Sequence, residues 1–158
     1  MKKKSILVGF LALLLFACED TVVPKPYTLS QLISGKESKT WKLDKLVTRV
    51  KGTDSPETLA PCESDDRYIF YANSEKLYEV DNGLKVCDNT EDTKLVSYIW
   101  AFNNANATLN MVVPHVFGYY YIPFTVKSID ANDMELEIFI NEEATVSYAL
   151  FFKKVEEK

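Results

Sequence analysis

The sequence MELEIFI, at residues 134–140, has the alternation that sets the expected fold. Apolar side chains recur at every second position, which places them on one face of an extended strand. The run TVSYALFFKKV, at residues 145–155, repeats this pattern after a short turn. The two runs therefore predict neighbouring antiparallel strands with the inward-facing residues Met134, Leu136, Ile138, Ile140, Val146, Tyr148, Leu150 and Phe152.

Similar short runs, rich in aromatic and β-branched residues, continue upstream between turn residues. Residues 52–61 contain a glycine and two prolines and are predicted to form a loop. Pro123 is predicted to mark a bulge or an edge, because proline cannot donate a ladder hydrogen bond. In all, the sequence predicts about eight strands, at 41–50, 67–72, 76–80, 94–102, 108–113, 119–129, 134–140 and 145–155.

A short helix is expected before the first strand. Thr28 can cap it, with Gln31 three positions on, and Gly35 can end it in a left-handed conformation. An antiparallel sheet of this size either splits into a sandwich or curls until its edges meet, and the strong last strand favours closure. We therefore predict an all-β fold, a single antiparallel up-and-down β-barrel of about eight strands with a short N-terminal helix.

The start of the chain has the layout of an export signal. Three lysines at 2–4 precede an apolar run at 6–16 that is too short for a permanent membrane span. The ending Leu15-Phe16-Ala17-Cys18 resembles the lipobox of bacterial lipoproteins, where the signal is cut before a cysteine that then carries lipid; the alternative is an ordinary signal peptide with a cysteine nearby. The resemblance implies a signal peptide at 1–17, a lipidated tether at 18–26, a domain at 27–158, and a location at the bacterial cell envelope, lipid-anchored to the outer membrane.

Composition excludes some classes of function. The chain has 158 residues, enough for one domain with a substantial core, and a formal charge of −5. Removing residues 1–17 takes away three lysines and no acids, which lowers the charge to −8. An acidic surface repels phosphate backbones, and no basic run interleaved with aromatics is present, so nucleic-acid binding is not expected.

Two cysteines follow Cys18, and the compartment beyond an export signal is oxidising. Cys62 and Cys87 are therefore predicted to form a disulfide, with a metal site or a reactive thiol as alternatives. Metal sites usually need further Cys or His at short spacing, and the one histidine, His115, is distant in sequence.

The whole pattern resembles the lipocalin-like domains of small bacterial lipoproteins. The motifs that carry the resemblance are Trp41-Lys42-Leu43 after a short helix, Cys62-Glu63-Ser64-Asp65-Asp66-Arg67-Tyr68-Ile69-Phe70, Lys85-Val86-Cys87-Asp88, Trp100 in a strand, and Tyr148-Ala149-Leu150-Phe151-Phe152-Lys153. It implies an up-and-down barrel, a disulfide between the second strand and the region after the third, and Trp41 plugging the closed end. Lys39 stands where classical lipocalins have glycine, so the kinship is at the level of fold and no function transfers.

No catalytic chemistry is expected. A single histidine in a Pro-His-Val-Phe-Gly loop cannot supply a triad by itself, and His115 is predicted to be a loop residue. Glu63, Asp65 and Asp66 could bind calcium through their oxygens, but they lack the glycine-centred spacing of a calcium loop and are predicted to be structural or solvated. No metal and no cofactor are predicted.

Aromatic residues are the candidates for binding. Tyr119 and Tyr121 fall on the opposite face of their strand and are predicted to mark a contact surface. The predicted lining of the barrel is Phe70, Tyr78, Trp100, Tyr120, Ile122, Phe124 and Tyr148. These side chains either surround a ligand pocket or fill the core.

Two functions are therefore expected. The first is a membrane-anchored binding protein that holds a small hydrophobic or amphipathic ligand in its barrel. The second is a non-enzymatic interaction module with a filled barrel, contacting envelope proteins or glycans. A continuous pocket lined by the predicted residues favours the first, and a filled interior favours the second.

Overall fold

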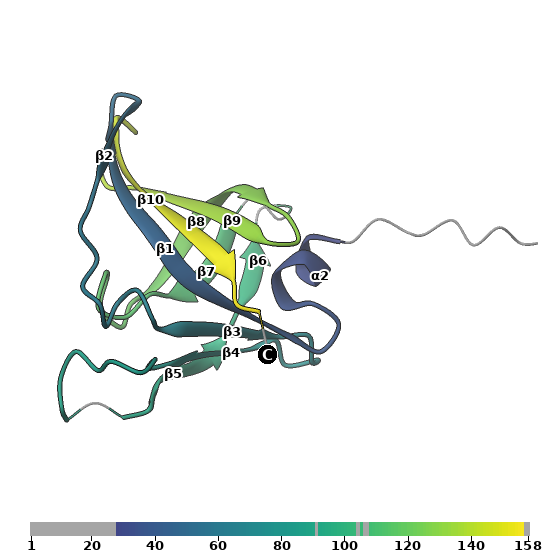
Figure 1. The fold of residues 1–158 in the computed structure, drawn as a ribbon. Coiled ribbons are helices and arrows are strands. Elements are labelled where there is room, and N and C mark those ends of the chain that lie inside the picture. Colours follow the sequence, from purple (N-terminus) through teal and green to yellow (C-terminus); the bar gives the residue numbers. More distant parts are fainter. Residues whose placement is uncertain (1–27, 91, 104, 106–107, 157–158) are drawn as a thin grey trace, which may run out of the picture.

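The computed structural model describes residues 28–156 except 91, 104, 106 and 107. One sheet curls into a nearly closed barrel, and one short helix lies at its end (Figure 1). The elements are α2 (Leu29–Ser34), β1 (Ser38–Val50), β2 (Thr53–Pro56), β3 (Arg67–Tyr71), β4 (Leu77–Asp81), β5 (Lys94–Ile99), β6 (Ala101–Asn103), β7 (Thr108–Val112), β8 (Tyr121–Ile129), β9 (Asp133–Phe139) and β10 (Val146–Lys154).

The barrel closes in two ways. The first long strand, β1, pairs with β3 on one side and with the last strand, β10, on the other. The first and last long strands are therefore neighbours in the sheet. β5 pairs with β4 and β6 pairs with β7, and only Trp100 separates β5 from β6. β5 and β6 are consecutive parts of one bent segment and count as one strand of the barrel. The described barrel therefore has eight strands, and β2 pairs with β1 outside this order. The all-β, up-and-down barrel prediction is confirmed.

Local irregularities shift the predicted pattern. The register of β1 against β10 changes between Leu43 and Lys45, so the extra residue Asp44 brings Leu46 to the interior after Leu43. In β8, the shift falls between Val126 and Ser128 and not at Pro123, where a bulge or an edge was expected. Pro123 instead pairs in register with Asn110.

Two predicted element boundaries are wrong. Residues 53–56 are not loop but form β2, which pairs with β1 and leaves only 57–66 between β2 and β3. The strand predicted to begin at Tyr119 begins at Tyr121, after a turn in which Gly118 has a φ of 68°. The turn around Gly118 occupies the residues that were expected to open the strand, so β8 starts two residues later than predicted.

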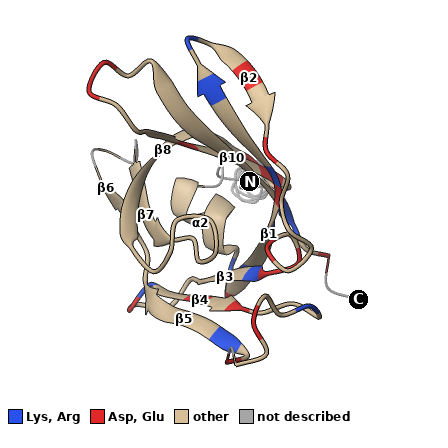
Figure 2. Ribbon diagram, turned by 90° about the vertical axis from the view of Figure 1, so that its left-hand side faces the viewer, with Lys and Arg blue, Asp and Glu red and all other residues tan. Residues whose placement is uncertain are grey.

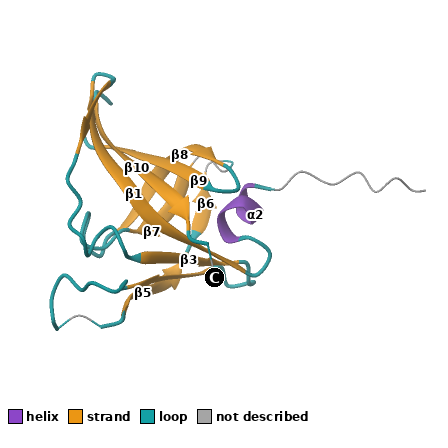
Figure 3. Cartoon of the chain, in the orientation of Figure 1, coloured by secondary structure: helices purple, strands orange, loops and turns teal. Residues whose placement is uncertain are grey.

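The helix closes one end of the barrel (Figure 3). Thr28 and Gln31 form the predicted capping box, and Gly35 ends α2 with a φ of 66°. The indole Nε1 of Trp41 donates a hydrogen bond of 2.8 Å to the carbonyl of Ile33, which fixes β1 against the helix. Trp41 is fully buried, so the expected plug at the closed end is confirmed.

Candidate functional site

The interior of the barrel is filled by four of the predicted lining residues. Phe70, Tyr78, Trp100 and Phe124 are buried in the core. The ring of Phe70 lies 4.7 Å from that of Tyr78 and 6.0 Å from that of Trp100, centroid to centroid. These distances are those of packed aromatic pairs, so the rings occupy one another's space and line no ligand cavity between them.

The polar atoms of these aromatics have partners inside the protein. The Tyr78 hydroxyl donates to the carbonyl of Val112 at 2.7 Å, and the Trp100 Nε1 donates to the carbonyl of Tyr71 at 3.1 Å. Burial, with smaller effects from Tyr68 and Asp66, raises the pKa of Tyr78 well above its ordinary value. Tyr78 is therefore a neutral core residue at physiological pH.

The other three predicted lining residues lie elsewhere. Ile122 and Tyr148 are half-buried and pack against the edge of the core. Tyr120 is 73% exposed and precedes β8, so the prediction that it points into the barrel is wrong. The turn at Gly118 delays the strand by two residues, and Tyr120 is not part of its alternation.

A pocket of about 380 Å³ is lined by residues of the loops after β2 and after β7. Both loops lie at the end of the barrel opposite α2 (Figure 1). We call this pocket the mouth pocket. Strand residues from β1 and β10 form its inner wall, and the two loops form its rim. Its lining residues are Leu46, Glu57, Thr58, Leu59, Glu63, His115, Val116, Phe117 and Tyr148.

The loop after β7 is shaped to place Phe117 over the core. The amide of Phe117 donates to the carbonyl of Val113 at 3.0 Å, and His115 has a φ of 55°, an unusual value outside glycine. The Phe117 ring lies 5.7 Å from Phe124 and 5.5 Å from Tyr148. Phe117 thereby joins the filled core to the mouth pocket.

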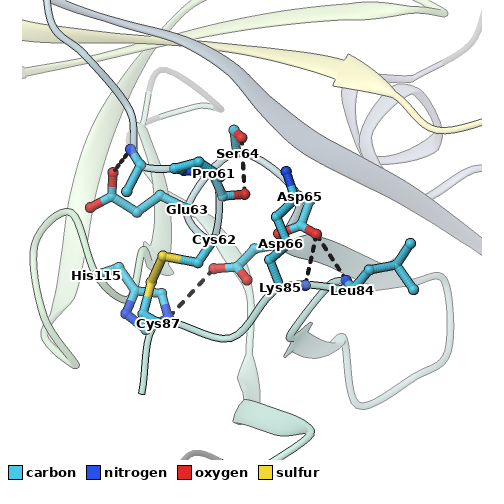
Figure 4. Close-up of a disulfide and its surroundings, with 11 residues drawn as sticks. Pro61, Cys62, Glu63, Ser64, Asp65, Asp66, Leu84, Lys85, Cys87 and His115 are labelled. Atoms are coloured by element: carbon cyan, nitrogen blue, oxygen red, sulfur yellow. Dashed lines mark hydrogen bonds and ion pairs between the residues drawn. A yellow bond between two sulfur atoms is a disulfide. The ribbon is translucent and has the colours of Figure 1, made fainter. Parts of the chain in front are cut away.

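His115 connects the pocket to a buried acid. Its Nε2 lies 3.7 Å from Oδ2 of Asp66, a side chain with no exposed surface (Figure 4). Burial of Tyr68 is the main cause that raises its pKa, and the negative charge of Asp66 raises it further. His115 is thus a loop residue, as predicted, and it also has a specific acidic contact that the sequence did not indicate.

The predicted disulfide lies beside this pair. Cys62 and Cys87 are bonded, with Cα atoms 5.2 Å apart, which confirms the prediction. Asp65 holds the same loop by accepting hydrogen bonds from the amides of Leu84 and Lys85 at 2.8 and 3.0 Å (Figure 4). A Cβ at Gly83 would lie 2.4 Å from Asp65, so glycine is needed for this close approach.

Two carboxylates stand at the rim of the mouth pocket. Oε1 of Glu57 accepts a hydrogen bond of 2.5 Å from the hydroxyl of Thr48, and Oε2 of Glu63 accepts one of 2.6 Å from the amide of Ala60. Thr48, which binds Glu57, lies opposite Tyr148 in the pairing of β1 with β10. The side chains of Thr48 and Tyr148 therefore lie on the same face of the sheet. The pocket therefore combines apolar and anionic surfaces.

A second pocket, of about 530 Å³, lies near the closed end. It is bordered by mainly polar residues of β1 and of the C-terminal segment, up to Glu156, where the described chain ends. Lys39, one of its residues, already donates to the carbonyl of Leu32 at 2.7 Å and lies over the Trp41 ring. The mouth pocket is the better candidate because its walls include several apolar and aromatic side chains, among them Leu46, Phe117 and Tyr148.

Other predicted features bear on the site only in part. Cys18, the predicted lipidation residue, lies outside the described residues. Within residues 28–156, as far as they are described, no group of three or more His, Cys, Asp or Glu is arranged to hold a metal ion. No helix in the described part of the chain is both long and apolar enough to cross a membrane.

Sequence reasoning missed most of the mouth pocket. Its rim comes from two loops, 57–63 and 115–117, that are distant in the chain and have no periodicity. Phe117 beside Gly118 was the available signal, because a large aromatic residue in a turn needs a place to pack. Only Tyr148 belongs to both the predicted lining and the pocket.

A scan against protein-family models finds none that matches this chain, and a search of curated proteins finds no match.

Proposed function

We propose that this chain is an exported, lipid-anchored binding protein that holds one small amphipathic molecule in the mouth pocket. The observation that carries the proposal is the make-up of that pocket, in which Leu46, Phe117 and Tyr148 stand beside Glu63 and His115. A volume of about 380 Å³ is within the range of small-molecule sites, which combine apolar walls with a few polar groups. Such a lining suits a ligand with an apolar body and a polar head.

The proposal places the ligand at the mouth and not in the interior. The rings of Phe70, Tyr78 and Trp100 fill the centre of the barrel, so a ligand there would have to displace core side chains at a cost of several kcal/mol. The mouth pocket needs no such displacement. The filled core then serves as the rigid floor of the site.

We also propose kinship with the lipocalin-like domains of bacterial lipoproteins, with lipid on Cys18 and residence at the outer membrane. Three features support it: the eight-stranded barrel, the helix packed beside Trp41, and the disulfide in front of the strand that begins at Arg67. The proposed role is binding without catalysis, and it involves no cofactor, metal or nucleic acid. No particular protein partner is proposed.

The test has two measurements. Native mass spectrometry of the full chain purified from its own host should detect a retained small molecule. Phe117→Ala should weaken binding of the neutral dye Nile red about tenfold, because a buried aromatic wall contributes at least about 1.5 kcal/mol. Tyr119→Ala, which removes an exposed ring outside the pocket, is the matched control. Dye binding that is unchanged by Phe117→Ala would contradict the proposal.

The filled interior favours a second candidate, a non-enzymatic interaction module that contacts an envelope protein or glycan. Large apolar side chains are exposed around β5 and the start of β8, and the rings of Tyr98 and Tyr121 pair there at 4.9 Å. This candidate predicts that Tyr119→Ser and Tyr120→Ser abolish a specific cross-link in the host envelope while Phe117→Ala leaves it intact. The opposite pattern would favour the mouth pocket.

A further inference from the structure

The rim carboxylates of the mouth pocket have neutral partners only. Glu57 receives its hydrogen bond from the Thr48 hydroxyl, and Glu63 receives its bond from the Ala60 amide. Two exposed carboxylates elsewhere on the described chain are paired with cations, Asp54 with Arg49 and Asp44 with Lys153. Neither rim glutamate forms an ion pair with a described lysine or arginine.

The basic group among the lining residues does not balance these charges. His115 faces Asp66, whose carboxylate is buried behind it. The lining residues include Glu57 and Glu63 and no lysine or arginine, so the pocket has an excess of negative charge. The net charge of the whole chain, −5, acts in the same direction by raising the local concentration of cations.

The aromatic wall adds a second preference for positive charge. The rings of Phe117 and Tyr148 border the pocket and meet edge to face, with centroids 5.5 Å apart and planes at 64°. The faces of such rings are negative and attract ammonium groups, in addition to the apolar contact that they provide. Carboxylates and aromatic rings thus act on the same ligand group.

We propose that the mouth pocket selects amphipathic cations, with a protonated amine held by Glu57 and Glu63 and an apolar body packed against Leu46, Phe117 and Tyr148. The inference rests on the proposed function, because it assumes that the pocket binds a small molecule. It adds the charge of the ligand, which the apolar wall alone does not determine. Fatty acids and other anionic amphiphiles are excluded by the same carboxylates.

Two probes of equal apolar size, 4-phenylbutylamine and 4-phenylbutanol, separate charge from hydrophobicity, and 4-phenylbutyrate, with one methylene fewer, carries the opposite charge. Isothermal titration calorimetry with the full-length chain at pH 7 and 150 mM salt should give the order amine, then alcohol, then carboxylate. Each half-exposed charge contact contributes a factor of about two to five, so two contacts give a preference of roughly tenfold for the amine over the alcohol. Raising the salt to 1 M should reduce that preference.

Glu57→Gln and Glu63→Gln test the assigned residues. Glutamine keeps an oxygen that can accept from Thr48 or Ala60, so each variant removes the charge and retains the hydrogen bond. Each should weaken amine binding two- to fivefold and leave alcohol binding unchanged. Glu75→Gln is the matched control, because Glu75 is exposed in the turn between β3 and β4, outside the mouth pocket. Thermal unfolding of each variant verifies that it is folded.

The outcomes distinguish the two proposals. Equal binding of all three probes, tighter binding of 4-phenylbutyrate, or an amine preference that survives both substitutions would overturn the charge assignment and leave the binding function standing. Failure of all three probes and of Nile red to bind would overturn the binding function itself. An amine preference that is lost in Glu57→Gln and Glu63→Gln but kept in Glu75→Gln supports the inference.

Discussion

Trp100 is the residue at which the segment 94–103 changes its partner strand, from β4 before it to β7 after it. It lies between β5 and β6 and is 2% exposed. Its amide bonds to the carbonyl of Lys76 on one side, and its indole packs edge to face against Phe70 and Phe102. The backbone changes pairing partner from β4 to β7 at this residue, so the barrel closes where the largest side chain is anchored.

Replacing Trp100 by alanine should therefore be severely destabilising. In a filled core, loss of the indole should cost about 3 to 5 kcal/mol of unfolding free energy, through lost burial and the cavity that remains. Urea unfolding at pH 7 measures this cost, with Tyr119→Ala as an exposed control that should change stability by less than about 0.5 kcal/mol. A cost below about 1 kcal/mol would show that the site around Trp100 is not packed.

Side-chain placement was predictable inside strands where alternation is unbroken, but not at their ends: Ile140, predicted to face inward, lies after β9 and is 52% exposed. Phe70 and Tyr78 face inward as expected, because each lies in a short strand without a register shift at its position. The prediction for Tyr120 is wrong because an alternating pattern does not show where a strand begins. The turn at Gly118 shifts the start of β8 to Tyr121. The bulge at Asp44 has no signal in the alternation either, since Val47 and Leu46 are both buried.

At the scale of elements, the disulfide ties the segment before β3 to the loop after β4. Asp65 and Gly83 form a second contact between the same two segments, which the sequence did not indicate. Replacing Cys62 and Cys87 by serine together should lower stability by about 3 to 4 kcal/mol, from the entropy of closing a separation of 25 residues in the unfolded chain. Urea unfolding of the double variant measures this; an unchanged midpoint would contradict it.

The outer face of β9 holds a charge cluster shared with its neighbours β8 and β10 and with β1, the strand beyond β10. Glu137 is 2% exposed, accepts from Ser147 at 2.6 Å and from Arg49 at 3.0 Å, and pairs with Lys127 at 3.2 Å. Figure 2 shows charges of both signs on the strands and loops. Burial raises the pKa of Glu137, but hydrogen bonds from Ser147, Lys127 and Arg49 outweigh it, and the pKa lies below its ordinary value.

This cluster makes stability depend on pH in a defined direction. A carboxyl whose pKa is lowered on folding stabilises the protein above the unfolded value of about 4.5, and the contribution is lost as pH falls through the folded pKa. Glu137→Gln should lower stability at pH 7 by roughly 1 to 3 kcal/mol, and its difference from wild type should shrink toward pH 3. Urea unfolding at both pH values tests this, with exposed Glu142→Gln as control; an equal difference at both would contradict it.

For the whole molecule, fold class was accessible from sequence because about eight alternating runs leave few architectures. The binding site was not, because the mouth pocket depends on how loops 57–63 and 115–117 meet in space. The N-terminal pattern carries a separate proposal, the lipid anchor on Cys18, which membrane fractionation tests.

Changing Cys18 to alanine should release the protein from the membrane or leave the signal uncut, because more than one acyl chain on that cysteine is needed for stable attachment. Membrane fractionation of host cells, followed by intact-mass measurement, distinguishes these results. Ala17→Gly, which keeps a small residue before the cysteine, should still fractionate with membranes. Unchanged membrane fractionation of a Cys18→Ala variant whose intact mass shows that the signal has been removed would exclude the lipid anchor.

The position of the capping helix bears on how the proposed ligand would reach the mouth pocket. The described chain starts at Thr28, beside α2, at the end of the barrel opposite the loops that form the mouth pocket (Figure 1). Nine residues lie between Cys18 and Thr28, and the ten Cα steps that join the two residues span at most about 36 Å. An anchor at Cys18 therefore favours an upright stance in which the pocket opens away from the bilayer. Cargo would then be exchanged with the surrounding fluid or with a facing partner, and not drawn laterally from the lipid leaflet below.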